Sequence, residues 1–163
     1  MQRNGSNKEK SEDEINDSLR SLLNMKFIVL DQTRQGMSES GKGKGEVDFL
    51  LNSDNNMPIA IMEALKANSL NKEYIDAHID KVLTKYDPLG CLHVFLLIYY
   101  NGKNLDSFWT RYIKHMYNYA FPYEKETEIT QVKTGYAEIK QANIGLNRKG
   151  SHVVFYSFVI QIV

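Results

Sequence analysis

The 163-residue sequence has a single cysteine, three prolines and no long hydrophobic run. One cysteine excludes an intramolecular disulfide framework and any zinc cluster made of cysteines alone, and it is typical of a reducing compartment. The longest apolar run, 91–100, is about half as long as a membrane-spanning helix. The first ten residues lack the apolar core of a signal peptide. We therefore expect a cytoplasmic protein with no membrane partner.

An excess of charge of one sign is also missing. Twenty Lys and Arg residues balance twenty Asp and Glu residues, and hydrophobic residues make up 42% of the chain. This composition is globular and excludes a disordered chain. Neutrality also argues against a wholly basic nucleic-acid coat protein. It permits an enzyme that touches nucleic acid over a small area.

The length and the apolar periodicity predict one domain with one core. We expect residues 1–10 to form a flexible N-terminal lead and residues 11–163 to form a single domain. The predicted elements are a helix at 11–25, strands at 27–30, 46–51 and 59–65, a helix at 71–86, a strand at 92–100, a helix at 105–119, and a strand pair at 135–145 and 151–163. This order predicts an α/β fold with a central mixed sheet flanked by helices, in which 92–100 is central.

Two acidic residues lie in strand candidates that are otherwise apolar. Asp48 and Glu63 are fifteen residues apart and are separated by the predicted turn at 52–58. Ionised carboxylates are rarely buried unless they are paired or bind a metal. If the two strands are neighbours, both acids point to one spot and form an oxygen-rich site suited to Mg²⁺ or Mn²⁺. Such a metal can activate water for phosphodiester hydrolysis, and Lys66 would offset charge on the phosphate.

These residues resemble a known family. The segment Gly-Glu-Val-Asp48-Phe-Leu-Leu, a turn, and then Ile-Ala-Ile-Met-Glu63-Ala-Leu-Lys66 is similar to the motif of the PD-(D/E)xK nuclease superfamily. The resemblance covers about residues 11–120, with the motif at 43–66. It implies a restriction endonuclease-like αβββαβ core, here followed by the C-terminal strand pair. It also implies that Asp48 and Glu63 bind the metal and that Lys66 takes part in catalysis.

The sequence departs from the family pattern at two positions. Val47 replaces the proline before the first acid, and two residues instead of one separate Glu63 from Lys66. On a regular strand Lys66 then points away from the face of Glu63. A bulge after Glu63, or a strand that ends there, would bring the lysine back. Without such a change the domain would hold metal ligands and would bind without cutting.

Other residues near the motif have a structural and a functional interpretation. Lys42 and Lys44, in a glycine-rich loop, either contact a nucleic-acid backbone or are simply solvated. Glu46 is either a third metal ligand or an ordinary edge residue. Glu14 either reaches the site or caps the first helix, because Ser11 and Glu14 have the spacing of a capping box.

Structural interpretations are favoured for the remaining candidates. His78 is expected to pack at the edge of its helix, and Cys91 is expected in the core. An aromatic stripe on the helix at 105–119 is either a base-stacking platform or, as we favour, core or an interface. The stripe consists of Phe108, Trp109, Tyr112, Met116 and Tyr119.

The sequence thus predicts a metal-dependent endonuclease that hydrolyses phosphodiester bonds in DNA with Mg²⁺ or Mn²⁺. The alternative is a catalytically inactive nuclease-like fold that serves as a nucleic-acid or protein interaction module. The resemblance further suggests the effector module of a bacterial antiviral defence or restriction system, within a larger parent protein or with an activating partner, and a homodimer as one arrangement. A neutral chain must gather DNA through local patches such as Lys42 and Lys44, through metal charge, or through a tethered partner.

Overall fold

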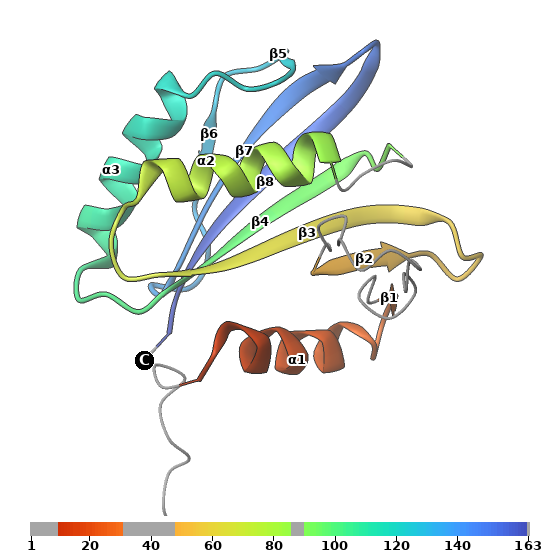
Figure 1. Cartoon of the computed structure of the whole chain (residues 1–163), viewed down its shortest axis with the longest axis horizontal. Helices are drawn as coiled ribbons and strands as arrows, with labels where there is room; N and C mark the ends of the chain where they lie inside the picture. The colour runs from red at the N-terminus through yellow and green to blue at the C-terminus, as the bar shows by residue number, and fades with distance from the viewer. Residues whose placement is uncertain (1–9, 31–47, 86–89, 163) are drawn as a thin grey trace, which may run out of the picture.

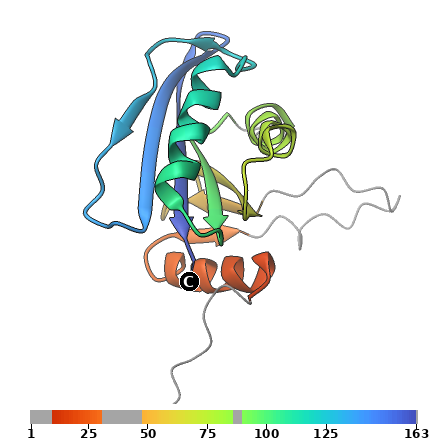
Figure 2. The same cartoon turned by 90° about the vertical axis from the view of Figure 1, so that its left-hand side faces the viewer.

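The fold is a single α/β domain built on one mixed sheet. The computed structural model describes residues 10–30, 48–85 and 90–162. Within these ranges an eight-stranded sheet has the order β1-β2-β3-β4-β8-β7-β5, and β6 also pairs with β7. Two helices, α2 and α3, lie on one side of the twisted sheet, and α1 lies on the other (Figures 1 and 2). No helix in the described ranges is long and apolar enough to cross a membrane.

The N-terminal elements form a helix followed by an antiparallel three-stranded meander. Their bounds are α1 (Glu12–Leu23), β1 (Ile28–Leu30), β2 (Phe49–Asn52) and β3 (Pro58–Ala67). The predicted capping box is present, because the Ser11 side chain accepts from the Glu14 amide and the Glu14 side chain accepts from the Ser11 amide. Strand β1 pairs with β2 and β2 pairs with β3, both antiparallel.

The next elements extend the sheet with parallel strands. They are α2 (Lys72–Asp80), which continues into a π-helical segment η2 (Lys81–Lys85), then β4 (His93–Tyr100) and α3 (Leu105–Asn118). Strand β4 runs parallel to β3 without interruption from Ala60 to Ala67. The order helix, three strands, helix, strand from α1 to β4 is the predicted order. Its assignment to the restriction endonuclease-like fold stays a prediction.

The C-terminal strands complete the sheet, and the last two of them form a long hairpin. They are β5 (Glu124–Lys125), β6 (Thr130–Val132), β7 (Ile139–Arg148) and β8 (Ser151–Gln161). The hairpin turns at Lys149 and Gly150, which both have positive φ, as a two-residue turn between twisted strands requires. Strand β8 inserts between β7 and β4 and runs parallel to β4. The sequence predicted the hairpin but neither this insertion nor the short exposed strands β5 and β6.

Apolar side chains pack in two layers, one on each face of the sheet. Between the sheet and α2 and α3, alternate strand residues such as Ile61, Leu65 and Leu96 pack against helix residues such as Ile75. On the other face, Phe49, Met62 and Ala64 belong to a second cluster, against which α1 packs. The alternation along β3 therefore assigns odd-numbered residues to the α2 side and even-numbered residues to the α1 side.

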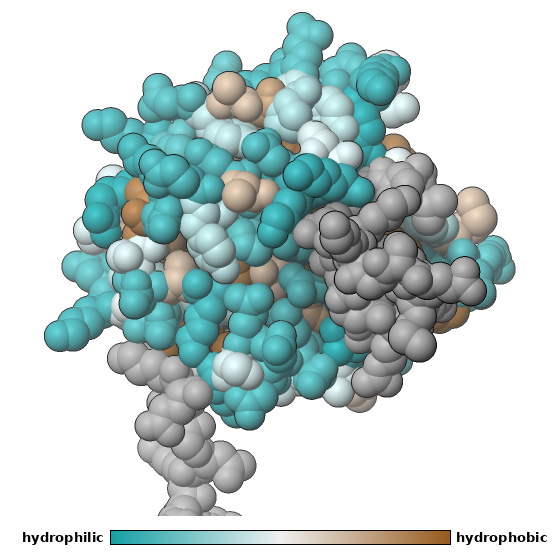
Figure 3. All heavy atoms as spheres, in the orientation of Figure 1, coloured by the Kyte–Doolittle hydropathy of each residue, from teal (hydrophilic) through white to brown (hydrophobic). Residues whose placement is uncertain are grey.

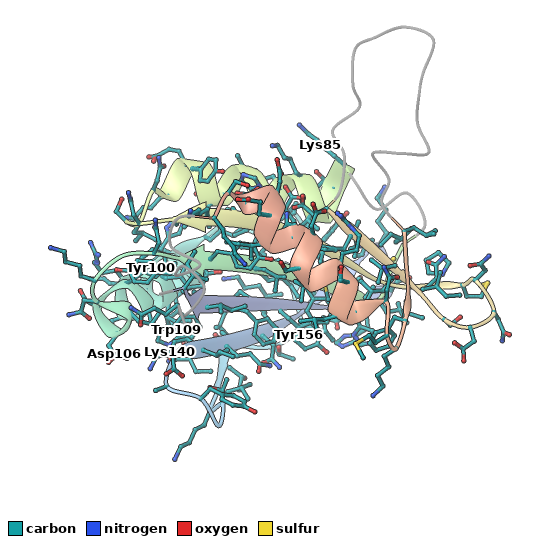
Figure 4. The ribbon with its side chains drawn as sticks, turned by 90° about the horizontal axis from the view of Figure 1, so that it is seen from below. Lys85, Tyr100, Asp106, Trp109, Lys140 and Tyr156 are labelled. Atoms are coloured by element: carbon teal, nitrogen blue, oxygen red, sulfur yellow. The ribbon has the colours of Figure 1, made fainter. Side chains whose placement is uncertain are left out.

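The aromatic stripe of α3 belongs to the first layer, as favoured from the sequence, and so does Cys91. Trp109 is almost fully buried and donates from Nε1 to Oε1 of Gln131 at 2.8 Å. Beside it, Lys140 and Asp106 form an ion pair at 2.7 Å (Figure 4). The buried rings leave no free stacking platform along this stripe.

Candidate acidic site

The two predicted acids lie side by side. Phe49 of β2 is paired with Met62 of β3, so Asp48, one residue before β2, lies beside Glu63 on the neighbouring strand. Asp48 Oδ2 accepts a hydrogen bond from the Ala64 amide at 2.7 Å. Glu63 lies within β3 instead of at its end, and only 4% of its surface is exposed. The register thus places Asp48 next to Glu63 on the neighbouring strand, and the negative charge of Glu63 helps to raise the pKa of Asp48.

A third carboxylate, from α1, joins them. Glu12 Oε2 accepts a hydrogen bond from the Lys66 amide at 2.9 Å. In the described part of the chain, β2 begins at Phe49 and no strand lies beside β3 beyond Met62, so the amides of Ala64 and Lys66 have no strand partner there. The carboxylates of Asp48 and Glu12 satisfy these two donors. The sequence had offered Glu14 as the acid from this helix, but the structure places Glu14 only in the capping box.

Glu63 is held by a histidine of α2. His78 Nδ1 lies 2.7 Å from Glu63 Oε1, and both side chains are buried. The other oxygen, Oε2, is buried and has no hydrogen-bond partner in the described part of the chain. An unpartnered buried carboxylate oxygen is costly, and a cation beside it would remove that cost. His78 therefore packs at the helix edge, as expected, but it also touches the site.

The charges of this acidic site are coupled. The pKa of Asp48 is raised to about 7, chiefly by burial and also by the negative charges of Glu63 and Glu12, against the lowering effect of the Ala64 amide. Burial also raises the pKa of Glu12. The pKa of Tyr74 is raised by burial and then by the charges of Glu12, Glu63 and Asp48. The three carboxylates thus share one electrostatic environment that favours a proton or a metal cation.

Polar side chains beneath the acids fix Asp48 from the α1 side. Asn16 is buried and its Nδ2 lies 3.4 Å from Asp48 Oδ1, while its Oδ1 accepts from the Tyr99 hydroxyl at 2.9 Å. The negative charges of Asp48 and Glu12 add to burial in raising the pKa of that hydroxyl. Sequence reasoning missed Glu12, Asn16 and Tyr99. The available signal was the i, i+4 spacing of Glu12 and Asn16 beside the apolar stripe of their helix.

The side chain of Lys66 is directed away from that of Glu63. The pairing of β3 with β4 is unbroken past Glu63, so the strand neither ends at Glu63 nor bulges there against β4. By the alternation of β3, the Lys66 side chain lies on the α1 side, and its Nζ donates to the Lys10 carbonyl at 2.5 Å. The predicted change that would bring the lysine back to Glu63 is wrong. Lys42, Lys44 and Glu46 lie outside the described residues.

The donor set suits a hard divalent cation bound through few protein ligands. In the described ranges, no group of three or more His, Cys, Asp or Glu side chains is arranged to enclose a metal ion. Mg²⁺ is commonly held by one or two carboxylates, with water and substrate phosphate as its other ligands. Asp48 and the free Oε2 of Glu63 fit that requirement.

Comparisons with known proteins add no name to this arrangement. No protein-family model matches the sequence, and neither the curated proteins nor the solved structures give a significant match. The function must therefore be argued from the site itself.

Proposed function

We propose that the protein is a metal-dependent endonuclease that hydrolyses phosphodiester bonds in DNA. The observation that carries the proposal is the pair of adjacent carboxylates, Asp48 and Glu63, with Glu63 Oε2 buried and unpartnered. Two coupled acids with one uncompensated oxygen are suited to a divalent cation. The wider assignment to a bacterial defence or restriction system rests on the sequence resemblance alone.

Each carboxylate has a defined support. The Ala64 amide orients Asp48, the Lys66 amide orients Glu12, and His78 orients Glu63. A divalent cation bound by Asp48 and Glu63 would polarise a phosphoryl oxygen and lower the pKa of a bound water. Glu12 lies near enough to raise the pKa of Asp48. Its negative charge strengthens cation binding. The same charge repels a substrate phosphate when no metal is bound, so metal binding should precede substrate binding.

One observation favours the non-catalytic alternative. The family resemblance assigns Lys66 to the chemistry, yet the Lys66 amine contacts the Lys10 carbonyl. A nuclease-like domain with metal ligands and a displaced lysine can bind nucleic acid or protein without cutting it. We favour catalysis because His78 and two backbone amides hold the three acids while Glu63 Oε2 is left without a partner among the described residues.

The test is cleavage of supercoiled plasmid and linear DNA with Mg²⁺ or Mn²⁺. Asp48→Asn and Glu63→Gln should each lower the cleavage rate by about 100-fold or more, as expected for loss of a group that stabilises the transition state. Lys66→Ala should keep most of the activity, and Glu14→Gln is the control carboxylate because it lies only in the capping box. Cleavage that survives both acid substitutions would overturn the site.

Calorimetric titration with Mn²⁺ separates the two functions. Specific Mn²⁺ binding that is lost in Glu63→Gln, without any DNA cleavage by the unsubstituted protein, would support the interaction module. Absence of specific Mn²⁺ binding would contradict both metal-based interpretations.

A further inference from the structure

A neutral nuclease needs a local positive surface, and the described residues contain one. An open pocket of about 520 Å³ lies between the start of α2 and α3. Its lining residues are Leu70, Lys72, Arg111, Lys114, His115 and Asn118. Four of these six can carry positive charge, and no acidic residue lines the pocket. We call this feature the basic pocket.

The α3 side of the basic pocket is a single helical stripe. Arg111, Lys114, His115 and Asn118 follow the i, i+3, i+4, i+7 spacing that aligns residues on one face of a helix. Lys72 faces them from the first turn of α2. Figure 1 shows the start of α2 next to α3 on the same side of the sheet. The positive charges therefore converge from two helices that are separated in the chain by η2 and β4.

An ion pair fixes the walls of the basic pocket. His115 Nε2 lies 2.6 Å from Asp76 Oδ1 and so joins α3 to α2. In residues 10–30, 48–85 and 90–162, no carboxylate forms an ion pair with Lys72, Arg111 or Lys114. Three cations thus remain available to an anionic ligand.

The basic pocket and the acidic site lie on opposite sides of α2. Lys72 and Asp76 occupy one side of the helix. Tyr74 and His78, which face the acids, follow Lys72 and Asp76 by two residues each, which is about 200° of rotation about the helix axis. A helix with its side chains is about 10 Å wide. That width corresponds to about three base-pair steps of roughly 3.4 Å along the axis of a duplex.

A second pocket lies at the beginning of α2. It has a volume of about 370 Å³ and is lined by polar residues that include Lys66, Asn71, Tyr74 and Asn101. Tyr74 lies in the electrostatic field of the three acids, and Asn71 directly precedes Lys72. The face that carries α2 and α3 is largely hydrophilic, with only small apolar spots (Figure 3). This surface suits a charged polymer better than an apolar partner.

We propose that the basic pocket binds backbone phosphates of the DNA strand whose cleaved bond lies at the acidic site. The proposal rests on the proposed nuclease function and names the surface that recruits its substrate. Lys72, Arg111 and Lys114 contact the phosphates, and the His115–Asp76 pair keeps α2 and α3 in register. Contacts to phosphates are independent of base sequence, so this pocket contributes affinity and position.

The test measures DNA binding without cleavage. A fluorescent 20-base-pair DNA is titrated with the whole chain in EDTA, and anisotropy is followed at several salt concentrations. The triple variant Lys72→Gln, Arg111→Gln, Lys114→Gln should bind at least ~10-fold more weakly, and the slope of log K against log salt should become shallower by about 0.9 for each lost phosphate contact. The control variant Lys26→Gln, Lys85→Gln, Lys133→Gln removes the same charge from exposed positions outside the pocket and should bind as the unsubstituted protein does.

The outcomes separate this inference from the nuclease function. If the pocket and control variants lose affinity equally, or if neither does, the basic pocket is not the DNA site, whether or not the protein cuts. If DNA binding depends on the pocket but no metal supports cleavage, the inference holds and the nuclease function fails. A parallel titration with inorganic phosphate alone should show no tight binding. Pocket-dependent phosphate binding without DNA binding would overturn the proposal in favour of a small phosphate ligand.

Discussion

Helix α2 carries a histidine–carboxylate contact on each of two opposite sides, and their surroundings differ. On one side His78 contacts Glu63 at 2.7 Å, and the carboxylate is only 5% exposed. On the other side His115 contacts Asp76 at 2.6 Å, with the carboxylate 30% exposed. The first contact lies among other acids, and the second lies beside three cations. In our proposals the same chemical pair supports a cation site in one place and an anion site in the other.

The strongest contrast is expected when each histidine is removed. His78→Ala leaves Glu63 buried with neither oxygen partnered, so we expect a loss of about 3 kcal/mol in the free energy of unfolding. His115→Ala leaves an acid that water can reach, so a loss of about 1 kcal/mol is expected. Urea denaturation of both variants at pH 7 measures the difference. Equal losses would show that the burial of Glu63 does not distinguish the two sides.

The acidic site should also set how stability depends on pH. The pKa of Asp48 is about 7 in the folded protein and 3.8 as its ordinary value, so the folded state holds a proton that the unfolded state releases. Stability from this group is present below pH 3.8 and is lost as pH rises to about 7. Asp48→Asn keeps an acceptor for the Ala64 amide and removes the loss of stability at higher pH, because asparagine does not ionise.

For Asp48→Asn, thermal unfolding without metal should show a gain on the order of 2 kcal/mol at pH 8 and almost none at pH 4. Asp106→Asn is the control because Asp106 pairs with Lys140 away from the acids. A gain for Asp48→Asn that does not change between the two pH values would contradict the assignment.

Glu12 should matter for cation binding, although less than Asp48 or Glu63. Glu12→Gln keeps a carbonyl oxygen for the Lys66 amide and removes one negative charge near the acids. We expect Mn²⁺ affinity to fall about 10-fold, at the lower end of the effect of groups that lie next to a metal ligand. Glu14→Gln, two residues along the same helix, should leave the affinity unchanged. Calorimetric titration of both variants tests the distinction, and equal effects would remove Glu12 from the site.

The smallest effect is expected at Lys66. Its amine contacts the Lys10 carbonyl, so Lys66→Ala should leave the Mn²⁺ affinity within about 2-fold of the original, a difference below about 0.5 kcal/mol. A large loss of Mn²⁺ affinity in this variant would mean that the lysine acts at the carboxylates after all.

The sequence predicted those parts of the fold in which local pattern and burial agree. The capping box of α1, the helical stripe of α3 and the apolar run of β4 all appear within a residue or two of their predicted bounds. The pairing of Asp48 with Glu63 was also predictable, because a short turn joins two strands with an unusual acid in each. The side of β3 on which Lys66 lies followed from strand alternation as well.

What the sequence could not supply was contact between distant elements. Glu12 reaches the site because, among the described residues, two amides of β3 have no strand partner and donate to carboxylates instead. The basic pocket forms only because α2 and α3 lie together on the same face of the sheet. His78 looked like a helix-edge residue because no periodicity shows which carboxylate will lie opposite it.

The position of β8 has a consequence for the order in which the protein folds. Its residues, 151–161, occupy the middle of the sheet beside β4, whose residues are made some fifty positions earlier. Until β8 has been synthesised, β4 presents an unpaired apolar edge, which is a ready template for wrong pairing. The acidic site, by contrast, is assembled from residues before β4. A ribosome-bound chain could therefore arrange its acids early and remain prone to aggregation until its final described strand arrives.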